Sequence, residues 1–310
     1  MTLREKLLDA AGRTAAARPA VAARAAAFVR ARVCPGGGFA DRSGRPDLYY
    51  TVFGLQTLAA VEASASRAGE SDDSRAYLAR FDPADLDVVH LCCLLRCRAL
   101  IEPKKVPGVF SSHTEKTPGT SLDRLETFRA VDGGYSHVPG AEHGTAYGAF
   151  LALGAYEDAG AELPDPDRLA DSLGRLRAAD GGYAGSPGAE TGLVPSTAAA
   201  VVTLAALGRT VDATAVDWLT AAQRPTGGWP AAVGAPTADL LSSATALHAL
   251  SAAGATLGDD ARAAARTFVE SLIQPAGPAP DAAGFRGHAA DTIADCEYTF
   301  YGLLALGHLT

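Results

Sequence analysis

Apolar and amphipathic segments alternate along most of the chain. Five segments are apolar on every helical face: YYTVFGLQTLAAV, TAYGAFLALGAY, STAAAVVTLAAL, LLSSATALHAL and EYTFYGLLAL. A helix that is apolar all round is buried on all sides. The segments that precede them, such as DPDRLADSLGRLRAA and DDARAAARTFVESLI, gather their charges on one face. The pattern therefore predicts buried inner helices, each paired with an amphipathic outer helix.

A short motif, two glycines followed by an aromatic residue, punctuates this alternation. It occurs as Gly37-Gly38-Phe39, Gly133-Gly134-Tyr135, Gly181-Gly182-Tyr183 and Gly227-Gly228-Trp229, with a reduced copy at Gly284-Phe285. The intervals between the glycines that precede the aromatics are 96, 48, 46 and 56 residues. The first interval is twice the second, so a unit without the motif is expected between them, with its inner helix around residues 88–95.

Six such hairpins predict an all-α fold, an (α/α)6 barrel in which concentric helix rings surround a lumen. We expect residues 1–310 to form a single domain of this kind. The glycines suit tight turns with positive φ, and the aromatics suit packing between hairpins. Two polar stretches interrupt the period: residues 63–82 are expected to be a long connection, and residues 102–121 a surface loop that can act as a lid.

The charge balance narrows the classes of partner. The formal net charge is −8, which is unfavourable for binding nucleic acid or an anionic membrane surface. The chain lacks the long apolar run of a membrane span and begins with the charged sequence MTLREKLLDAAGR, unlike a secretory signal. Its five cysteines are odd in number and irregularly spaced, which favours a reducing compartment. We therefore expect a cytoplasmic protein.

Three segments carry a family resemblance. The sequence GGFADRSGRPDLYYTVFGLQTL resembles the Gly-Gly-Phe repeat of geranylgeranyltransferase β subunits. LVPSTAAAVVTLAAL and PTADLLSSATALHAL resemble the Ser-Thr-Ala helices of squalene-hopene-type cyclases. The resemblance spans essentially the whole chain and implies the barrel fold, although such repeats mark packing rather than catalysis.

The catalytic residues of both families are replaced. Aligning the repeats puts Asp239, Leu241 and Tyr298 where protein prenyltransferases carry the Asp, Cys and His that bind zinc. The basic residues for a prenyl diphosphate are replaced by AAVGA at 231–235, and the Asp-x-Asp-Asp acids of class II cyclases by PSTAA at 195–199. The resemblance thus implies neither zinc-dependent prenyl transfer nor the usual cyclase acid, and we expect no cofactor.

The first turns of the inner helices should line the barrel mouth. An acid there can hold its proton at neutral pH, and Asp239 and Asp295 occupy matching places in adjacent repeats, where they could share one. The predicted catalytic residues are Asp239, Asp295, Glu297 and Tyr298. The predicted substrate-binding residues are Asp47, Tyr50, Phe53, His143, Tyr147, Trp229, Arg286, His288 and Tyr301. The alternative roles are capping for the two aspartates and core packing for the aromatics.

Two metal sites are weaker alternatives. His90, Cys93 and Cys97 share one helix face, and Asp239 with Asp295 and Cys296 could form an altered zinc site. Cysteines on an apolar helix are more often core residues, and neighbouring residues on a helix diverge by about 100°. We therefore predict no metal site.

Three functions fit these features. The favoured one is a terpene-cyclase-like enzyme that cyclises or isomerises an isoprenoid or other apolar substrate by acid–base chemistry, without metal, in specialised metabolism. The alternatives are a non-catalytic lipid- or peptide-binding protein and a β-like subunit that needs a protein partner. Replacing the acids should abolish turnover in the first case and spare binding in the second. In the third, the isolated chain should expose an apolar patch.

Overall fold

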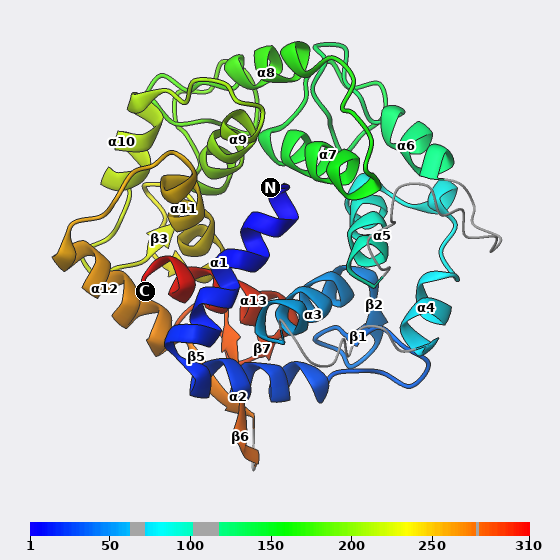
Figure 1. Ribbon diagram of the computed structural model, residues 1–310. Coiled ribbons are helices and arrows are strands. Elements are labelled where there is room, and N and C mark those ends of the chain that lie inside the picture. Colours follow the sequence, from blue (N-terminus) through cyan, green and yellow to red (C-terminus); the bar gives the residue numbers. More distant parts are fainter. Residues whose placement is uncertain (63–71, 102–117, 277–278) are drawn as a thin grey trace.

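The computed structural model describes residues 1–62, 72–101, 118–276 and 279–310. Within these ranges six inner helices form a ring, in which each helix packs on the next along the chain (Figure 1). They are α3 (Leu48–Val61), α5 (Val88–Ile101), α7 (Ala146–Ala159), α9 (Val194–Ala206), α11 (Leu240–Ala252) and α13 (Cys296–His308). Helix α13 packs on α3 and closes the ring. The predicted all-α barrel is confirmed.

An outer helix precedes each inner helix in the part of the chain that the structure describes. These helices are α2 (Pro19–Arg30), α4 (Asp72–Leu78), α6 (Pro118–Glu126), α8 (Pro166–Gly174), α10 (Ala213–Ala221) and α12 (Asp259–Ser271). They surround the inner ring in Figure 1. Their amphipathic sequences follow from this position, because one face packs inward and the other meets water. In α8, for example, Leu169 and Leu173 are buried while Asp167 and Arg168 are exposed.

The unit without a glycine motif is present as α4, the short 3-10 helix η1 (Pro83–Asp85) and α5. Helix α5 confirms the inner helix expected around residues 88–95. Residues 63–82, however, are not wholly a connection, since α4 lies within them. It escaped prediction because it has only seven residues, and only Ser74, Tyr77 and Leu78 are buried. The loop expected at 102–121 falls largely outside the described residues, and positions 118–121 belong to α6.

Short antiparallel β-ribbons connect outer to inner helices. β1 (Phe39–Ala40) pairs with β2 (Pro46–Asp47), β3 (Trp229–Pro230) with β4 (Ala238–Asp239), and β6 (Ala279–Arg286) with both β5 (Ile273–Ala276) and β7 (Ala294–Asp295). In each ribbon the motif aromatic lies opposite the aspartate that starts the inner helix: Phe39 opposite Asp47, Trp229 opposite Asp239 and Phe285 opposite Asp295. These ribbons therefore fix where α3, α11 and α13 begin.

The fifth repeat shows why the motif has this composition. Gly227 has a φ of +100°, which side chains disfavour. A Cβ atom on Gly228 would lie 2.7 Å from the Phe268 ring of the next outer helix, so glycine permits that approach. Trp229 is fully buried, and its backbone N–H donates to the Ser243 hydroxyl at 2.9 Å. The predicted turn and packing roles are confirmed.

The reduced copy of the motif joins the last repeat to the first. A Cβ atom on Gly284 would lie 2.5 Å from the Phe28 ring of α2. Phe28 and Phe285 are both 1 % exposed. The same glycine-to-aromatic contact that links neighbouring repeats thus also closes the ring.

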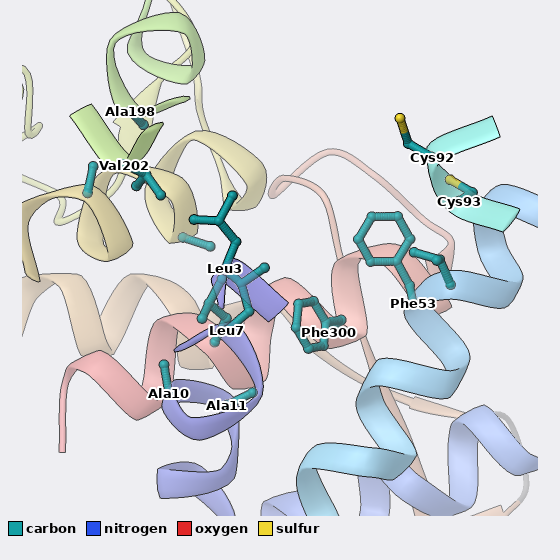
Figure 2. Close-up of a cluster of buried hydrophobic side chains, with 14 of the residues drawn as sticks. Leu3, Leu7, Ala10, Ala11, Phe53, Cys92, Cys93, Ala198, Val202 and Phe300 are labelled. Carbon is teal, nitrogen blue, oxygen red and sulfur yellow. The ribbon is translucent and has the colours of Figure 1, made fainter. Parts of the chain in front are cut away.

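Helix α1 (Leu3–Ala17) precedes the six hairpins and crosses the lumen at the C-terminal ends of the inner helices (Figure 1). Thr14 donates from Oγ1 to the Leu303 carbonyl at 2.6 Å, and Arg13 from Nε to that of Gly307 at 3.0 Å. Leu3 and Leu7 are buried, and Figure 2 shows them in the core cluster near Val202 of α9 and Phe300 of α13. Burying each leucine contributes roughly 1.5–3 kcal/mol, so α1 is an integral cover for this end of the lumen.

None of the helices within the described ranges is long and apolar enough to cross a membrane.

Candidate active site

The lumen contains a largely apolar cavity of about 440 Å³. This volume lies in the range of small-molecule sites. All the inner helices and α1 contribute to its wall. Its lining includes Leu7, Tyr49, Phe53, Gln56, Cys92, Cys93, Arg96, Tyr147, Phe150, Ser196, Ala198, Ala199, Val202, Leu241, Thr245, His248, Phe300, Tyr301 and Leu304.

One side of the cavity is aromatic. The Tyr49 and Phe53 ring centres are 5.0 Å apart and nearly perpendicular, and Phe53 lies 5.4 Å from Tyr301 and 6.1 Å from Phe300. These residues come from α3 and α13, the helices that close the ring. Helix α9 contributes the small residues Ala198 and Ala199. The wall therefore offers π faces on one part and open volume on another.

A regular position on the inner helices points into the lumen. The second residue of α3, α7, α9 and α11 lines the cavity; these residues are Tyr49, Tyr147, Pro195 and Leu241. Glu297 holds the same place in α13. In α5 this position is Val89, which is not among the lining residues, so the position is apolar or aromatic in the first five repeats and acidic in the last.

Glu297 is a buried acid joined to the lumen through Tyr49. The Tyr49 hydroxyl donates to Oε1 of Glu297 at 2.7 Å, and the Glu297 residue is 9 % exposed. Burial raises the pKa of Glu297 to about 7; Asp295 adds to this shift, while Tyr49 and Arg42 oppose it. Near neutral pH the carboxyl can therefore both hold and release a proton.

Glu297 also borders a second, polar pocket of about 420 Å³, here called the mouth pocket. It is lined by Arg42, Tyr50, His288, Ala290, Asp291, Thr292, Glu297 and Tyr298. Arg42 donates from Nε to Asp295 at 2.7 Å and from Nη2 to Asp291 at 2.8 Å. The pair of Glu297 and Tyr49 therefore connects a charged pocket with the apolar lumen.

The two aspartates expected to face one another have separate partners. Asp239 begins α11 and accepts from the Ser242 N–H at 2.7 Å and the Ser242 hydroxyl at 2.8 Å. Asp295 begins α13 and accepts from the Tyr298 N–H at 2.9 Å as well as from Arg42. Burial raises the pKa of both. The structure thus supports their alternative role as helix caps, and the hydrogen bonds among the described residues do not join the two carboxyl groups.

The predicted substrate-binding residues divide among three places. Phe53, Tyr147 and Tyr301 line the lumen, and Tyr50 and His288 line the mouth pocket, as does the predicted catalytic Tyr298. Asp47 caps α3 through the Tyr50 N–H.

The remaining three substrate-binding predictions lie outside both cavities. Trp229 donates from Nε1 to the Leu219 carbonyl at 2.7 Å within the packing between helices. Arg286 donates to the backbone carbonyls of Ser271 and Asp291. His143 lies 3.5 Å from Asp132 in the connecting loop. Their place near the loop motif misled the prediction, because these loop residues bind their own repeat.

The residues at the positions where protein prenyltransferases bind zinc do not fit a zinc ion. Asp239 is engaged by Ser242, Leu241 has no donor atom and lines the lumen, and Tyr298 lines the mouth pocket. Among the described residues no group of three or more His, Cys, Asp or Glu side chains is arranged to hold a metal.

The candidate metal ligands on α5 also lie apart. His90 contacts Asp87 at 2.9 Å on an exposed face, whereas Cys93 lines the lumen and Cys97 is fully buried. Cys296 is likewise buried. Burial raises the pKa of these thiols, which favours the unreactive neutral form.

Several polar residues that line these cavities were not among the predicted site residues, including Arg42, Tyr49, Gln56, Arg96 and His248. Arg96 donates from Nη1 to Gln56 at 3.1 Å and also bonds Asp158, which lies 2.9 Å from Arg4 of α1. A signal for Arg96 and His248 was present, since each places an ionisable side chain in the middle or second half of a largely apolar inner helix. A polar residue is kept in such a helix only where it has a partner or a function.

Comparison with known proteins places this geometry in a family. The prenyltransferase alpha-alpha toroid domain matches residues 22–85 and 146–240, together more than half of the chain. The chain therefore belongs to the family of prenyltransferase alpha-alpha toroid domains. No curated protein sequence matches it.

Solved structures with the same fold include two kinds of protein. Protein geranylgeranyltransferase-I from Candida albicans, complexed with GGPP, superposes with a TM-score of 0.54 at 11 % identity, over 99 % of this chain and 91 % of that one. The type II terpene cyclase MstE from Scytonema, in complex with geranylgeranyl dihydroxybenzoate, gives 0.53 at 16 % identity, over 99 % and 98 %. Identities this low establish the fold alone.

Proposed function

We propose that this chain is a metal-independent, terpene-cyclase-like enzyme that cyclises or isomerises an isoprenoid or other apolar substrate by proton transfer in the lumen. The observation that carries the proposal is the bond between Glu297 and Tyr49. It joins an acid with a pKa of about 7 to a hydroxyl on the cavity wall. The ligands of the similar structures, GGPP and geranylgeranyl dihydroxybenzoate, support an isoprenoid chain as the substrate class.

The proposed reaction begins at Tyr49. Protonated Glu297 donates to the Tyr49 oxygen while the Tyr49 hydroxyl proton passes to one carbon of a substrate double bond. The π electrons form the new C–H bond and leave a cation on the other carbon. A second double bond attacks the cation to form a C–C bond in a cyclisation, and a proton is finally lost from carbon. The product is an isomer of the substrate, and the returned proton restores the pair.

The cavity wall suits such a cation. The faces of Phe53, Phe300 and Tyr301 can stabilise positive charge, by about 2 kcal/mol or more where water is excluded. The Glu297 carboxylate left after proton transfer is a nearby counterion that retains the Tyr49 bond. The apolar lining also keeps water from capturing the cation.

The test is incubation of the purified chain with a panel of prenylated substrates in D2O, followed by mass spectrometry of the products. We expect an isomeric product carrying deuterium on carbon. Glu297→Gln should reduce turnover by about 10²–10⁴-fold, and Tyr49→Phe by a similar factor if the proton passes through its oxygen. Asp239→Asn is the matched control, because asparagine also caps helices, and it should retain turnover.

The pH profile gives a second readout. The acid form of Glu297 is the active one, so turnover should be constant below about pH 7 and fall tenfold per pH unit above it. Substrate binding by the wild type without turnover of any panel member would instead support the non-catalytic lipid-binding alternative. Undiminished turnover by Glu297→Gln would remove this residue from the mechanism.

A further inference from the structure

A second layer of inner-helix residues faces the lumen, seven positions beyond the layer that contains Tyr49. The ninth residue of five inner helices lines the cavity; these residues are Gln56, Arg96, Val202, His248 and Leu304. Seven residues of helix span about 10 Å, so this layer lies toward the end of the lumen that α1 crosses (Figure 1). In α7 the ninth residue is Gly154. A Cβ atom there would lie 2.7 Å from Nη2 of Arg96, so the glycine leaves room for the guanidinium group.

Arg96 is the permanently charged member of this layer. Its Nε atom donates to Asp158, and its Nη1 atom donates to Oε1 of Gln56 at 3.1 Å. Nη2 has no hydrogen-bond partner among the described residues, and it is not one of the unpaired nitrogens that the fold seals from solvent. The side chain is 13 % exposed and lines the lumen. Arg96 therefore keeps donors that a ligand in the lumen can reach.

The charged groups around Arg96 do not balance. The carboxylate of Asp158 is 1 % exposed and is shared with Arg4 of α1, whose Nε atom lies 2.9 Å away. The nearby Glu157 accepts from a backbone N–H of α1 at 2.6 Å and is also within the field of Lys6 and Arg96. Three cations, Arg4, Lys6 and Arg96, thus face two carboxylates, which leaves one positive charge in excess. A charge at the wall of an apolar cavity is costly unless it is paired.

We propose that Arg96 binds the carboxylate of the lumen ligand, so that the ligand is an isoprenoid acid whose chain extends from the Arg96 layer toward Tyr49. This inference rests on the proposed function in taking the lumen to be an isoprenoid site. The planar guanidinium group forms directional, charge-assisted hydrogen bonds with a carboxylate. One carboxylate also supplies the single negative charge that the wall lacks. A diphosphate would bring surplus negative charge into the apolar cavity.

Equilibrium dialysis at pH 7.5 with farnesoic acid and its methyl ester tests this proposal, because the two probes share one chain and differ in charge. The wild type should bind the acid about tenfold more tightly than the ester, which corresponds to about 1.4 kcal/mol. Arg96→Met should remove the preference, because methionine keeps an apolar wall and lacks the donors. Arg96→Lys should restore part of it, since lysine supplies the charge without the planar fork.

Arg129→Met is the matched control. Arg129 pairs with Glu126 at 2.8 Å and is 14 % exposed, so it is as buried as Arg96, but it lines neither cavity. This variant should keep the tenfold preference for the acid. Gly154→Ala should weaken binding of the acid and spare the ester, because its Cβ atom displaces the guanidinium group. An undiminished preference in Arg96→Met, or an equal loss in Arg129→Met, would overturn the proposal.

Carbon-13 NMR of farnesoic acid labelled at the carboxyl carbon supplies a readout on the wild type, which does not depend on the folding of an Arg96 variant. A cation in contact favours the charged form of a carboxyl group. The pKa of the probe should therefore be lower when it is bound than when it is free. A pKa raised on binding would place the carboxyl group in apolar surroundings away from Arg96 and overturn the proposal.

The two proposals fail in different ways. Equal binding of the acid and the ester by the wild type would overturn the role of Arg96 and leave the isoprenoid lumen in place. Arg96-dependent binding of dodecanoic acid, without binding of either farnesyl probe, would keep the carboxylate site and overturn the isoprenoid one. Tighter binding of farnesyl diphosphate than of farnesoic acid would overturn the assignment of a carboxylate. Glu297→Gln should keep the preference for the acid, because its defect is expected in turnover alone.

Discussion

The fifth and sixth repeats start their inner helices in the same way and then diverge. Both begin with an aspartate cap, Asp239 in one and Asp295 in the other, opposite a buried aromatic of the β-ribbon. Two residues later the fifth repeat presents Leu241 to the lumen and the sixth carries Glu297. The comparison teaches that the repeat supplies a position facing the lumen, while the chemistry depends on which side chain occupies it and what lies across the ring.

The caps also differ in their surroundings. Asp239 bonds within its own helix to Ser242, whereas Asp295 bonds across the ring closure to Arg42 of the first repeat. Arg42 also bonds Asp291 and lies 5.5 Å from the Tyr298 ring centre. The side-chain bonds of the Asp239 cap thus stay within its own helix, whereas those of the Asp295 cap reach the first repeat. Three stability measurements would sharpen this contrast.

Glu297 should have the largest effect on the free energy of unfolding. The folded-state pKa of Glu297, about 7, is above its ordinary value of 4.5. Between these values the folded chain keeps a proton that the unfolded chain loses, so this group stabilises the fold below about pH 4.5. That contribution falls as pH rises, by on the order of 3 kcal/mol by pH 7.

Glu297→Gln should lack this contribution to the pH dependence. Urea denaturation at pH 5 and pH 8 should show the variant gaining about 3 kcal/mol relative to the wild type at the higher pH. Asp239→Asn, measured at the same two pH values, shows how replacing the cap of the fifth repeat compares with replacing Glu297. An unchanged difference between wild type and Glu297→Gln at the two pH values would show that the Glu297 pKa is not raised.

The cross-ring ion pair should have a smaller effect. Arg42→Met leaves Asp295, whose side chain is 2 % exposed, without its cation, and we expect a loss of about 2 kcal/mol in the free energy of unfolding at pH 8. The loss should shrink as the pH is lowered, because burial raises the pKa of Asp295 and protonation removes its unpaired charge. Arg45→Met, in the same loop, removes an arginine whose side chain is 81 % exposed and should cost less than about 0.5 kcal/mol. Equal losses for the two variants would contradict a special role for Arg42.

The smallest effect belongs to the self-contained cap. Ser242→Ala removes the hydroxyl bond to Asp239 and keeps the backbone N–H bond, so it should cost about 1 kcal/mol. Thermal unfolding at neutral pH measures this, with the exposed Ser271→Ala as a control. A loss as large as that of Arg42→Met would contradict the expectation that the local cap of the fifth repeat contributes less to stability than the cross-ring ion pair.

Much of the fold was accessible to sequence reasoning because each repeat follows local rules. The apolar inner segments, the amphipathic outer ones and the glycine–aromatic motif all act within one hairpin or between neighbours. The same rules suggested that Asp239 and Asp295 can cap helices, which the structure supports. They failed for α4, which is too short to show a period, and for α1, whose buried face follows no repeat.

The candidate site was accessible only in part. Glu297 stood out as an acid beside an apolar helix, and Phe53 and Tyr301 as aromatics on inner helices. Which residues face the lumen depended on the register set by the β-ribbons, and that register placed Trp229 in the core. Without this register, the sequence does not distinguish residues near the loop motif that face the lumen from those that pack within their own repeat.

The sequence by itself determined the repeats, the two helix rings and the capped starts of the inner helices, because these depend on spacing along the chain. The tertiary structure alone decided which side chains pair across the closure of the ring. Tyr49 meets Glu297 across 248 residues, Arg42 meets Asp295 across 253, and Arg13 meets His308 across 295. Ring closure brings the first and last segments of the chain together, and no local periodicity encodes which side chains then come into contact.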